Sequence, residues 1–395
     1  MSTANTAQFD QADEQAQADL VERYAKTEIA PFVTQWDAAG EFPRALYQRA
    51  GQLGLLGMGY PEQFGGTPAN QRMRNVVSLG LARHGASGGV NASLFSHSIG
   101  LPIIIQHGSA ELQQEVVPAI LRGDKISALA ITEPDGGSDV AAIRTTAVAD
   151  GGDYLLNGEK TFITSGVRAD YVTTAVRTGD AGSRGAAGIS MLVVPMHLAG
   201  VSRTRLDKMG WLCSDTAHIR FDNVRVAARY RLGAECAGFK MIMGNFNGER
   251  LGMSVLALGF AQACFDEALG WARQRKTFGE LLLEHQVVRH KLVDMQMRIS
   301  STQAWVNALT DCADAGAASA GGQVTANWVA EVCMLKNHAT QTMRFCADQA
   351  VQILGGMGFM RGTTSERIYR EVKVMMIGGG AEEIMKELAA RQLGL

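Results

Sequence analysis

Two groups of residues in this chain have the chemistry to hold a phosphorylated molecule. The first is the run Gly136-Gly137-Ser138, because glycines let backbone amides approach a phosphate closely. The second is Arg275, whose guanidinium fork suits phosphate oxygens. Without a ligand, the glycine run would be a surface turn after a strand, and Arg275 would be a solvated arginine at a helix end. No Gly-x-Gly-x-x-Gly element follows a strand and no P-loop pattern occurs, so nicotinamide-Rossmann and P-loop folds are excluded.

The glycine run belongs to a zone for which the pattern predicts β-structure. Asn157-Gly158, between the strand-like residues 154–156 and 159–164, predicts a hairpin, because Asn-Gly readily takes the positive φ angles of a type I′ turn. Further strand-like runs are residues 171–177, 189–195 and 218–226. Their spacing predicts a small β-domain.

Helical patterns lie on both sides of this zone. From about Gln11 to Arg122 the helical pattern is broken by turn clusters, and Gly108 followed by Ser109 predicts a helix stop and a capped restart. After about Gly238 apolar residues again recur at helical spacing, which marks a buried stripe: Val288, Leu292, Met295 and Ile299.

The order of elements predicts an α+β protein with three domains. We expect an N-terminal α-helical domain over 1–125, a central β-domain over 126–235 and a C-terminal four-helix bundle over 236–395. Residues 315–322 are mostly small and predict a connector between two long helices of the bundle.

Composition excludes several classes of protein. The chain has 395 residues, a net charge of -2 and 46% hydrophobic residues, which is enough for a large core and gives no basic stripe for nucleic acid. No apolar run approaches the ~18 residues of a membrane span. Residues 1–10 carry no targeting pattern, and the 6 cysteines include no CxxC pair, so we expect a cytoplasmic protein with reduced thiols. The 8 histidines show no ligand spacing, so no metal is expected.

From about Tyr24 to its end, the chain resembles the acyl-CoA dehydrogenase family. Four motifs carry the resemblance, and they are spread over the central and C-terminal zones: residues 130–139, 157–164, 275–286 and 350–356. The resemblance implies the same three domains, a homotetramer and one FAD in each subunit.

The resemblance also assigns cofactor residues. In the β-domain, Leu129, Ile131 and Thr132 would line the isoalloxazine ring, with Thr132 at its pyrimidine edge. Gly137 and Ser138 would face cofactor phosphate or the CoA moiety, so Ser138 is also a substrate candidate. Phe162 would pack on the flavin and Thr164 would bond to it.

A second set of residues resembles the element with which one subunit clasps the FAD of its neighbour. Arg275 would pair with the pyrophosphate, and the rest of that surface would be Thr277, Phe278, Gln286, Gln352 and Gly356. Ala381 and Glu383 are further expected cofactor contacts near the C-terminus. This arrangement implies an obligate oligomer.

The residue that removes the substrate's α-proton is not where many relatives carry it. In those relatives a glutamate near the C-terminus precedes Gly-Thr, whereas here the position is Gly379. Residues 245–251 resemble the helix that carries the base in isovaleryl-CoA and long-chain acyl-CoA dehydrogenases. We therefore expect Glu249 as the base and Arg250 as a substrate contact. The alternatives are a surface Glu-Arg pair, or Glu382 or Glu383 as the base.

The resemblance implies a complete reaction. Glu249 would take the α-proton while hydride leaves the β-carbon for flavin N5, which gives a trans-2-enoyl-CoA. The Gly379 N–H and the ribityl 2′-hydroxyl would stabilise the enolate oxygen. Glycines at 378–380 remove bulk, so we expect a branched or medium-to-long acyl chain, with an electron-transferring flavoprotein as electron acceptor. The rivals are a flavin monooxygenase or oxidase on this scaffold and a catalytically idle acyl-CoA-binding protein.

Overall fold

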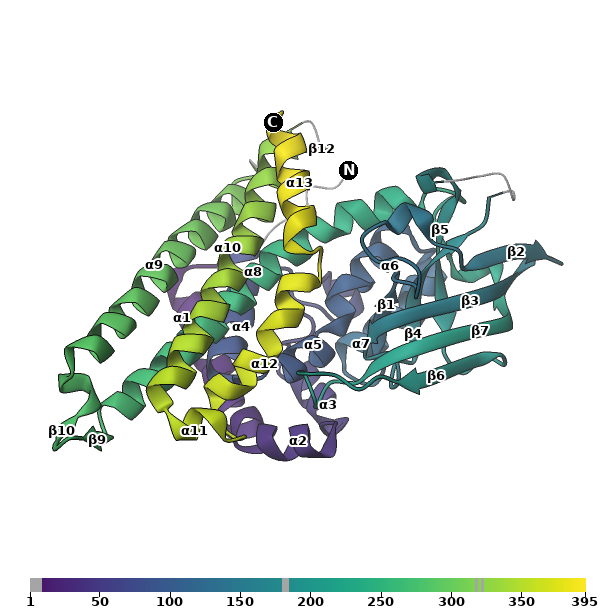
Figure 1. Cartoon of the computed structure of the whole chain (residues 1–395). Coiled ribbons are helices and arrows are strands. Elements are labelled where there is room, and N and C mark those ends of the chain that lie inside the picture. The colour runs from purple at the N-terminus through teal and green to yellow at the C-terminus, as the bar shows by residue number, and fades with distance from the viewer. Residues whose placement is uncertain (1–8, 180–184, 317–318, 321–322) are drawn as a thin grey trace.

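The computed structural model describes residues 9–179, 185–316, 319–320 and 323–395. In these ranges an N-terminal group of helices, a β-sheet and a C-terminal group of long helices lie against one another (Figure 1), which confirms the α+β prediction. Residues 1–8 of the N-terminal segment and part of the predicted connector 315–322 lie outside the described residues. None of the described helices is long and apolar enough to cross a membrane.

The described residues of the N-terminal part form seven α-helices. They are α1 (Gln11–Tyr24), α2 (Val33–Ala39), α3 (Ala45–Gln52), α4 (Gln71–Gly80), α5 (Gly88–Leu94), α6 (Leu101–His107) and α7 (Ala110–Leu121). The predicted stop and restart is confirmed: α6 ends at His107, and the Ser109 side chain accepts the Leu112 N–H at the start of α7.

The described residues of the central part form one sheet. Its strands are β1 (Ser127–Ala130), β2 (Thr146–Asp150), β3 (Asp153–Thr164), β4 (Tyr171–Arg177), β5 (Ile189–Pro195), β6 (Val201–Arg205), β7 (Thr216–Ala227) and β8 (Arg231–Leu232). They follow the order β6-β7-β3-β2-β4-β5-β8, and β1 pairs with β4 in parallel. The strands expected at 171–177, 189–195 and 218–226 are confirmed as β4, β5 and most of β7.

The prediction of a hairpin at Asn157-Gly158 is wrong. β3 runs through these residues, and the hairpin joins β2 to β3 at Gly151-Gly152, both of which have positive φ. Gly158 instead sits where the register of β3 against β7 shifts, with a φ of 138°. A Cβ there would lie 2.7 Å from the Thr145 Cα, so glycine is required by close backbone approach.

The C-terminal part is a bundle of long helices. It contains α8 (Gly238–Ala272), α9 (Gln286–Asp314), α10 (Ala326–Leu354), α11 (Gly356–Phe359), α12 (Thr364–Ile377) and α13 (Glu382–Leu393). Short strand pairs are β9 (Lys276–Thr277) with β10 (Glu280–Leu281), and β11 (Ser319–Ala320) with β12 (Gln323–Val324). Leu292, Met295 and Ile299 are buried, as the stripe predicts, and Val288 is half-buried.

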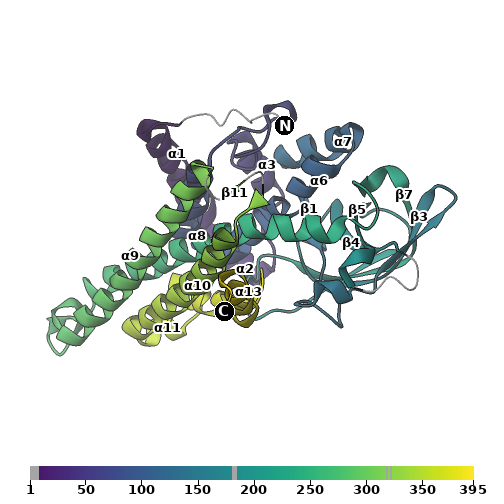
Figure 2. The same cartoon turned by 90° about the horizontal axis from the view of Figure 1, so that it is seen from above.

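The fourth position of the bundle is filled by two helices in succession. α12 and α13 follow one another along α10, with a break between them at residues 378–381 (Figure 1). In both views the end of the bundle where α8 leads into α9 lies opposite the sheet (Figures 1 and 2).

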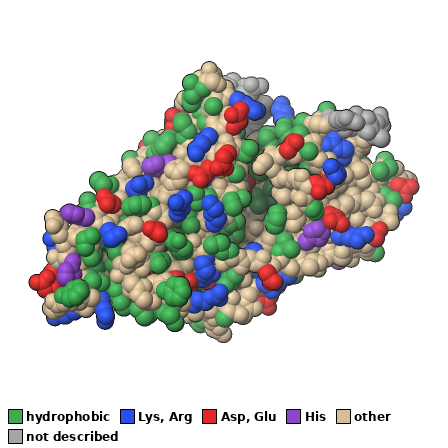
Figure 3. All heavy atoms as spheres, viewed as in Figure 1, with side chains coloured by type: hydrophobic (Ala, Val, Ile, Leu, Met, Phe, Trp, Pro, Cys, Tyr) green, Lys and Arg blue, Asp and Glu red, His purple; other side chains and the backbone are tan. Residues whose placement is uncertain are grey.

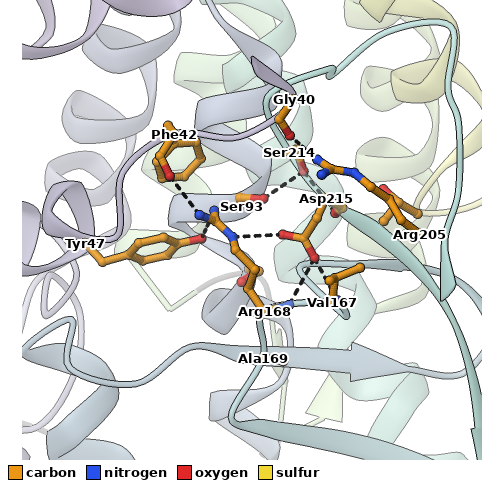
Figure 4. A network of polar contacts seen from close by, with 12 residues as sticks. Gly40, Phe42, Tyr47, Ser93, Val167, Arg168, Ala169, Arg205, Ser214 and Asp215 are labelled. Atoms are coloured by element: carbon orange, nitrogen blue, oxygen red, sulfur yellow. Dashed lines mark hydrogen bonds and ion pairs between the residues drawn. The ribbon is translucent and has the colours of Figure 1, made fainter. Parts of the chain in front are cut away.

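A polar network joins the N-terminal helices to the sheet. Arg168, which follows β3, donates to Asp215 at 3.2 Å and to the Phe42 carbonyl at 2.8 Å, and its guanidinium lies over the Phe42 ring (Figure 4). The other Asp215 oxygen accepts the Val167 N–H at 2.7 Å, and the Ser93 and Ser214 hydroxyls are 2.7 Å apart. These contacts fix the orientation of the sheet that carries the expected flavin residues.

Candidate active site

The break between α12 and α13 lies against the middle of α8. Gly379 and Gly380 have φ angles of 66° and 109°, which side chains rarely adopt. A Cβ on Gly379 would lie 2.6 Å from the Met253 Sδ and 3.9 Å from the Glu249 Oε1. The Glu249 carboxylate therefore lies beside position 379, although the two residues are far apart in the sequence.

The Glu249 side chain is half-buried, and one of its carboxyl oxygens is shielded from solvent. Its Oε2 is inaccessible to solvent and has no hydrogen-bond partner among the described residues. Burial raises the pKa of Glu249 to about 7, against the opposing charges of Arg250 and Lys336. A carboxyl with such a pKa is suited to take a proton at neutral pH.

Arg250 is turned toward the break between α12 and α13. It is 6% exposed, and its guanidinium donates to the Gly379 carbonyl at 3.2 Å and to the Asn247 amide oxygen at 3.0 Å. The expected alternative of a solvated surface Glu-Arg pair does not describe these two side chains.

The backbone at the break includes an N–H that finds no partner in the described part of the chain. The Gly378 N–H donates to the Val374 carbonyl at 2.7 Å and ends α12. The Gly379 N–H has no acceptor among the described residues. A free amide near a carboxyl of raised pKa can stabilise an oxyanion on a molecule bound between them.

The two rival glutamates lie in the first turn of α13. Glu382 is half-buried and already bonded: its carboxylate accepts from the Gln341 amide, and its carbonyl accepts from Asn337 at 3.0 Å. Glu383 is exposed, and Ala381 is the half-buried cap residue of the helix. Glu249 differs from both, because one of its carboxyl oxygens is shielded from solvent and has no partner among the described residues.

Phe162 lies at an irregularity of β3. The register against β7 shifts between Lys160 and Ile163, and Phe162 takes a φ of 59°. The ring is 70% exposed, although the neighbouring side chains are buried. Strained backbone that presents an apolar ring outward indicates a binding surface.

Thr132 lies beside this irregularity. Its carbonyl accepts the Thr161 N–H at 2.9 Å, and Thr164 ends the same strand. A Cβ on Gly137 would lie 3.3 Å from the Thr132 methyl carbon, so the glycine run folds back over Thr132. The structure thus places the predicted residues 132 and 137 side by side, next to the strand that carries 162 and 164.

The remaining predicted residues of this part differ in exposure. Ile131 is buried, Leu129 on β1 is half-buried, and Ser138 is exposed beside Gly137. The Ile131 side chain therefore packs beneath this surface, and only its backbone could contact a molecule bound there.

A buried ion pair that no sequence pattern predicted braces this segment. The Lys160 ammonium, fully buried, donates to the Glu133 carboxylate at 2.8 Å and to the Ile131 carbonyl at 3.0 Å. Glu133 also accepts the Arg144 and Thr145 N–H groups. Burial lowers the pKa of Lys160 to about 8, and Glu133 opposes the shift. A Glu and a Lys within two neighbouring motifs were the signal available in the sequence.

The second set of predicted cofactor residues lies at the far end of the bundle. Thr277 on β9 is half-buried, and the others are exposed: Arg275, Phe278, Gln286, Gln352 and Gly356. Phe278 is fully exposed, with a φ of 52°. This end lies opposite the sheet, so within one chain the two sets are not brought together.

A surface hollow separates the C-terminal helices from the sheet. In Figure 3 it opens between the α12–α13 side and the β-domain, with hydrophobic side chains at its floor. A carboxyl of raised pKa, a backbone N–H without an acceptor among the described residues and an exposed aromatic ring are groups that an enzyme could use to remove a proton from a largely apolar molecule.

Comparisons with known proteins agree with this class. Models of the acyl-CoA dehydrogenase N-terminal, middle and C-terminal domains match residues 11–124, 128–224 and 237–394. The long-chain specific acyl-CoA dehydrogenase of Rattus norvegicus is 34% identical over 95% of this chain and 85% of its own length.

Two solved structures support the same conclusion. A probable acyl-CoA dehydrogenase of Mycobacterium abscessus is 43% identical, covers 98% of this chain and 99% of its own, and superposes with a TM-score of 0.92. A glutaryl-CoA dehydrogenase of Mycobacterium smegmatis in complex with FADH2 is 26% identical, covers 98% and 95%, and has a TM-score of 0.88. The chain belongs to the acyl-CoA dehydrogenase family of flavoprotein oxidoreductases.

Proposed function

We propose that this enzyme catalyses the FAD-dependent α,β-dehydrogenation of an acyl-CoA thioester to a trans-2-enoyl-CoA, with Glu249 as the base. The observation that carries the proposal is the position of the Glu249 carboxylate, 3.9 Å from where a side chain of residue 379 would begin. In relatives that carry the catalytic glutamate at the position of Gly379, the side chain of the base begins at this same point.

The residues around the break have distinct tasks in this reaction. Glu249 takes the α-proton, and its raised pKa lets it act near neutral pH. The Gly379 N–H donates to the thioester oxygen, where negative charge develops. FAD, when bound, supplies the acceptor for the hydride that leaves the β-carbon, so the α–β bond becomes a double bond.

The residues of the β-domain fit a flavin. Phe162 offers an exposed ring, Thr132 and Thr164 offer polar groups beside it, and Gly137 and Ser138 leave backbone amides accessible. Leu129 and Ile131 pack beneath them. We propose that Ala381 and Glu383 complete this side of the site from the start of α13.

The far end of the bundle would serve the flavin of another subunit. The exposed Arg275 would pair with the pyrophosphate, and Thr277, Phe278, Gln286, Gln352 and Gly356 would form the surrounding surface. Because this end lies opposite the sheet of its own chain, the proposal requires an oligomer, and we propose a homotetramer.

The substrate and the electron acceptor complete the proposal. Residues 378–380 carry no side chains, so a branched or a medium-to-long acyl chain has room beside the reacting carbons. The similarity to a long-chain specific relative supports this choice. We propose Arg250 as a CoA or substrate contact and an electron-transferring flavoprotein as the acceptor of the electrons.

Anaerobic mixing with a panel of straight and branched acyl-CoAs tests the proposal. We expect rapid flavin bleaching with at least one branched or medium-to-long member. Glu249→Gln should slow bleaching by about 10²–10⁴-fold, because a general base typically contributes that much. Glu387→Gln, on the exposed side of α13, should bleach like the unaltered enzyme.

Other outcomes would change the assignment. Loss of bleaching in Glu382→Gln but not in Glu249→Gln would move the base to α13. Bound flavin that no acyl-CoA bleaches would favour the monooxygenase or oxidase alternative. A colourless protein that binds acyl-CoA would favour a catalytically idle scaffold.

A further inference from the structure

Lys336 is a buried cation that has no part in the reaction described above. It lies on α10, is fully buried, and donates to the Gly380 carbonyl at 2.8 Å and to the Met376 carbonyl at 3.1 Å. One ammonium thus bonds the chain on both sides of Gly379. A lysine is rarely this buried unless a specific structure depends on it.

Arg250 bonds the same turn from α8. Its donation to the Gly379 carbonyl means that the carbonyls of residues 376, 379 and 380 all accept from buried cations. These bonds fix the turn although glycine backbone is conformationally permissive. They do not engage the Gly379 N–H, which has no acceptor in the part of the chain that the structure describes and could donate to a bound molecule.

We propose that Lys336 is a positioning residue for the dehydrogenation: it holds the turn around Gly379 in its active shape and places a fixed positive charge near the Glu249 carboxylate. The inference rests on the proposed function and extends it to a residue that does not touch the substrate. Because its test compares variants of one enzyme, its failure can be told apart from failure of the reaction.

The charges around Lys336 set the direction of the expected effect. The groups that act on it are Glu249 and Arg250 from α8, Cys333 from its own helix and Glu382 from α13, and burial lowers its pKa to about 8. Its positive charge, with that of Arg250, lowers the pKa of Glu249 against the effect of burial. Removing the Lys336 charge should therefore raise the pKa of Glu249.

The test is the pH dependence of flavin bleaching in Lys336→Met, with an acyl-CoA that bleaches the unaltered enzyme. The base works when ionised, so the acid limb of the rate profile should move to higher pH by about 1 unit. Hydrogen–deuterium exchange of residues 374–385 should be faster in the variant without substrate. Lys336→Arg keeps the charge, so its acid limb should lie at the pH of the unaltered enzyme.

Lys208→Met is the matched control. Lys208 is half-buried, whereas Lys336 is fully buried, but its pKa is likewise lowered by burial to about 8. It donates to the Trp211 carbonyl at 2.9 Å and lies in the β-domain. It should leave the acid limb unchanged. Lys336→Gln, which keeps an amide donor without the charge, replaces Lys336→Met if that variant does not fold.

Two results would overturn the proposal. One is an acid limb that stays in place in a folded, uncharged Lys336 variant. The other is an equal shift in Lys208→Met, which would indicate a general loss of stability. If the unaltered enzyme bleaches with no acyl-CoA, the proposed function itself fails, and that result is independent of Lys336.

Discussion

The setting that makes Glu249 a suitable base also costs stability. Its carboxyl has a pKa of about 7 in the folded chain, against 4.5 as the ordinary value, because burial disfavours the charged form. The folded state therefore binds a proton that the unfolded state has released between these pH values. Stability is unaffected below pH 4.5, falls as the pH rises toward 7, and stays reduced above it.

Glu249→Gln should therefore raise the melting temperature at pH 8 and change it little at pH 5. Glutamine keeps the size of the side chain and removes the charge, and the gain is on the order of 3 kcal/mol at most. Calorimetry of the two proteins at both pH values measures the difference. Glu371 has a similarly raised pKa, but it is present in both proteins and cancels. An equal melting temperature at pH 8 would contradict the desolvated state of Glu249.

At the scale of strands and helices, irregular places present the expected site residues. Phe162 is turned outward by a register shift in β3, and Gly379 lies in the break between α12 and α13. Regular segments supply rigidity, since β3 pairs with β7 along most of its length. Asn157-Gly158 is another irregular place, a bulge inside β3.

Gly158→Ala should destabilise the enzyme by roughly 1–3 kcal/mol, because its backbone is strained for alanine and Thr145 leaves no space. Gly151→Ala is the control: this glycine also has positive φ, but nothing lies within 4 Å of its added Cβ. Gly151→Ala should lower the free energy of unfolding by only about 1 kcal/mol. Urea unfolding measures both values. Equal costs would contradict the close approach of β3 to Thr145.

The sequence predicted the regular elements better than the irregular ones. Strand-like runs of residues located β4 and β5, which are buried along most of their length, and helical spacing located the buried stripe of α9. The Asn157-Gly158 prediction failed because a bulge and a type I′ turn favour the same residues. The outward Phe162, and the hold of Lys336 on the 376–380 turn, depend on partners from other segments, which local patterns do not report.

At the scale of the whole molecule, the two groups of expected FAD residues lie on opposite sides of the folded subunit. Phe162 is on β3 and Thr132 follows β1, whereas Arg275 and Phe278 flank β9, at the end of the bundle opposite the sheet. Phe278 is fully exposed, which is unusual for so large an apolar side chain. This separation is what an enzyme that shares each cofactor between two subunits requires.

Arg275→Ala should weaken FAD binding by about 10–100-fold, because a hydrogen bond to a charged group contributes about 1.5–3 kcal/mol. Arg273→Ala, two residues earlier and also exposed, should bind FAD as before. Flavin retained after dialysis and the mass of the particle by light scattering measure binding and assembly. Unchanged FAD affinity in Arg275→Ala would contradict a site shared between subunits.

The nearness of Glu249 to Gly379 has a consequence for how this enzyme is compared with its relatives. A column-by-column alignment would find glycine where many of them have their catalytic acid, and would classify the chain as inactive. The fold brings a helix from elsewhere in the sequence to the same place. An ancestor could exchange one position for the other without moving the chemistry in space. Homologues without an acid at either position are the better candidates for lost activity.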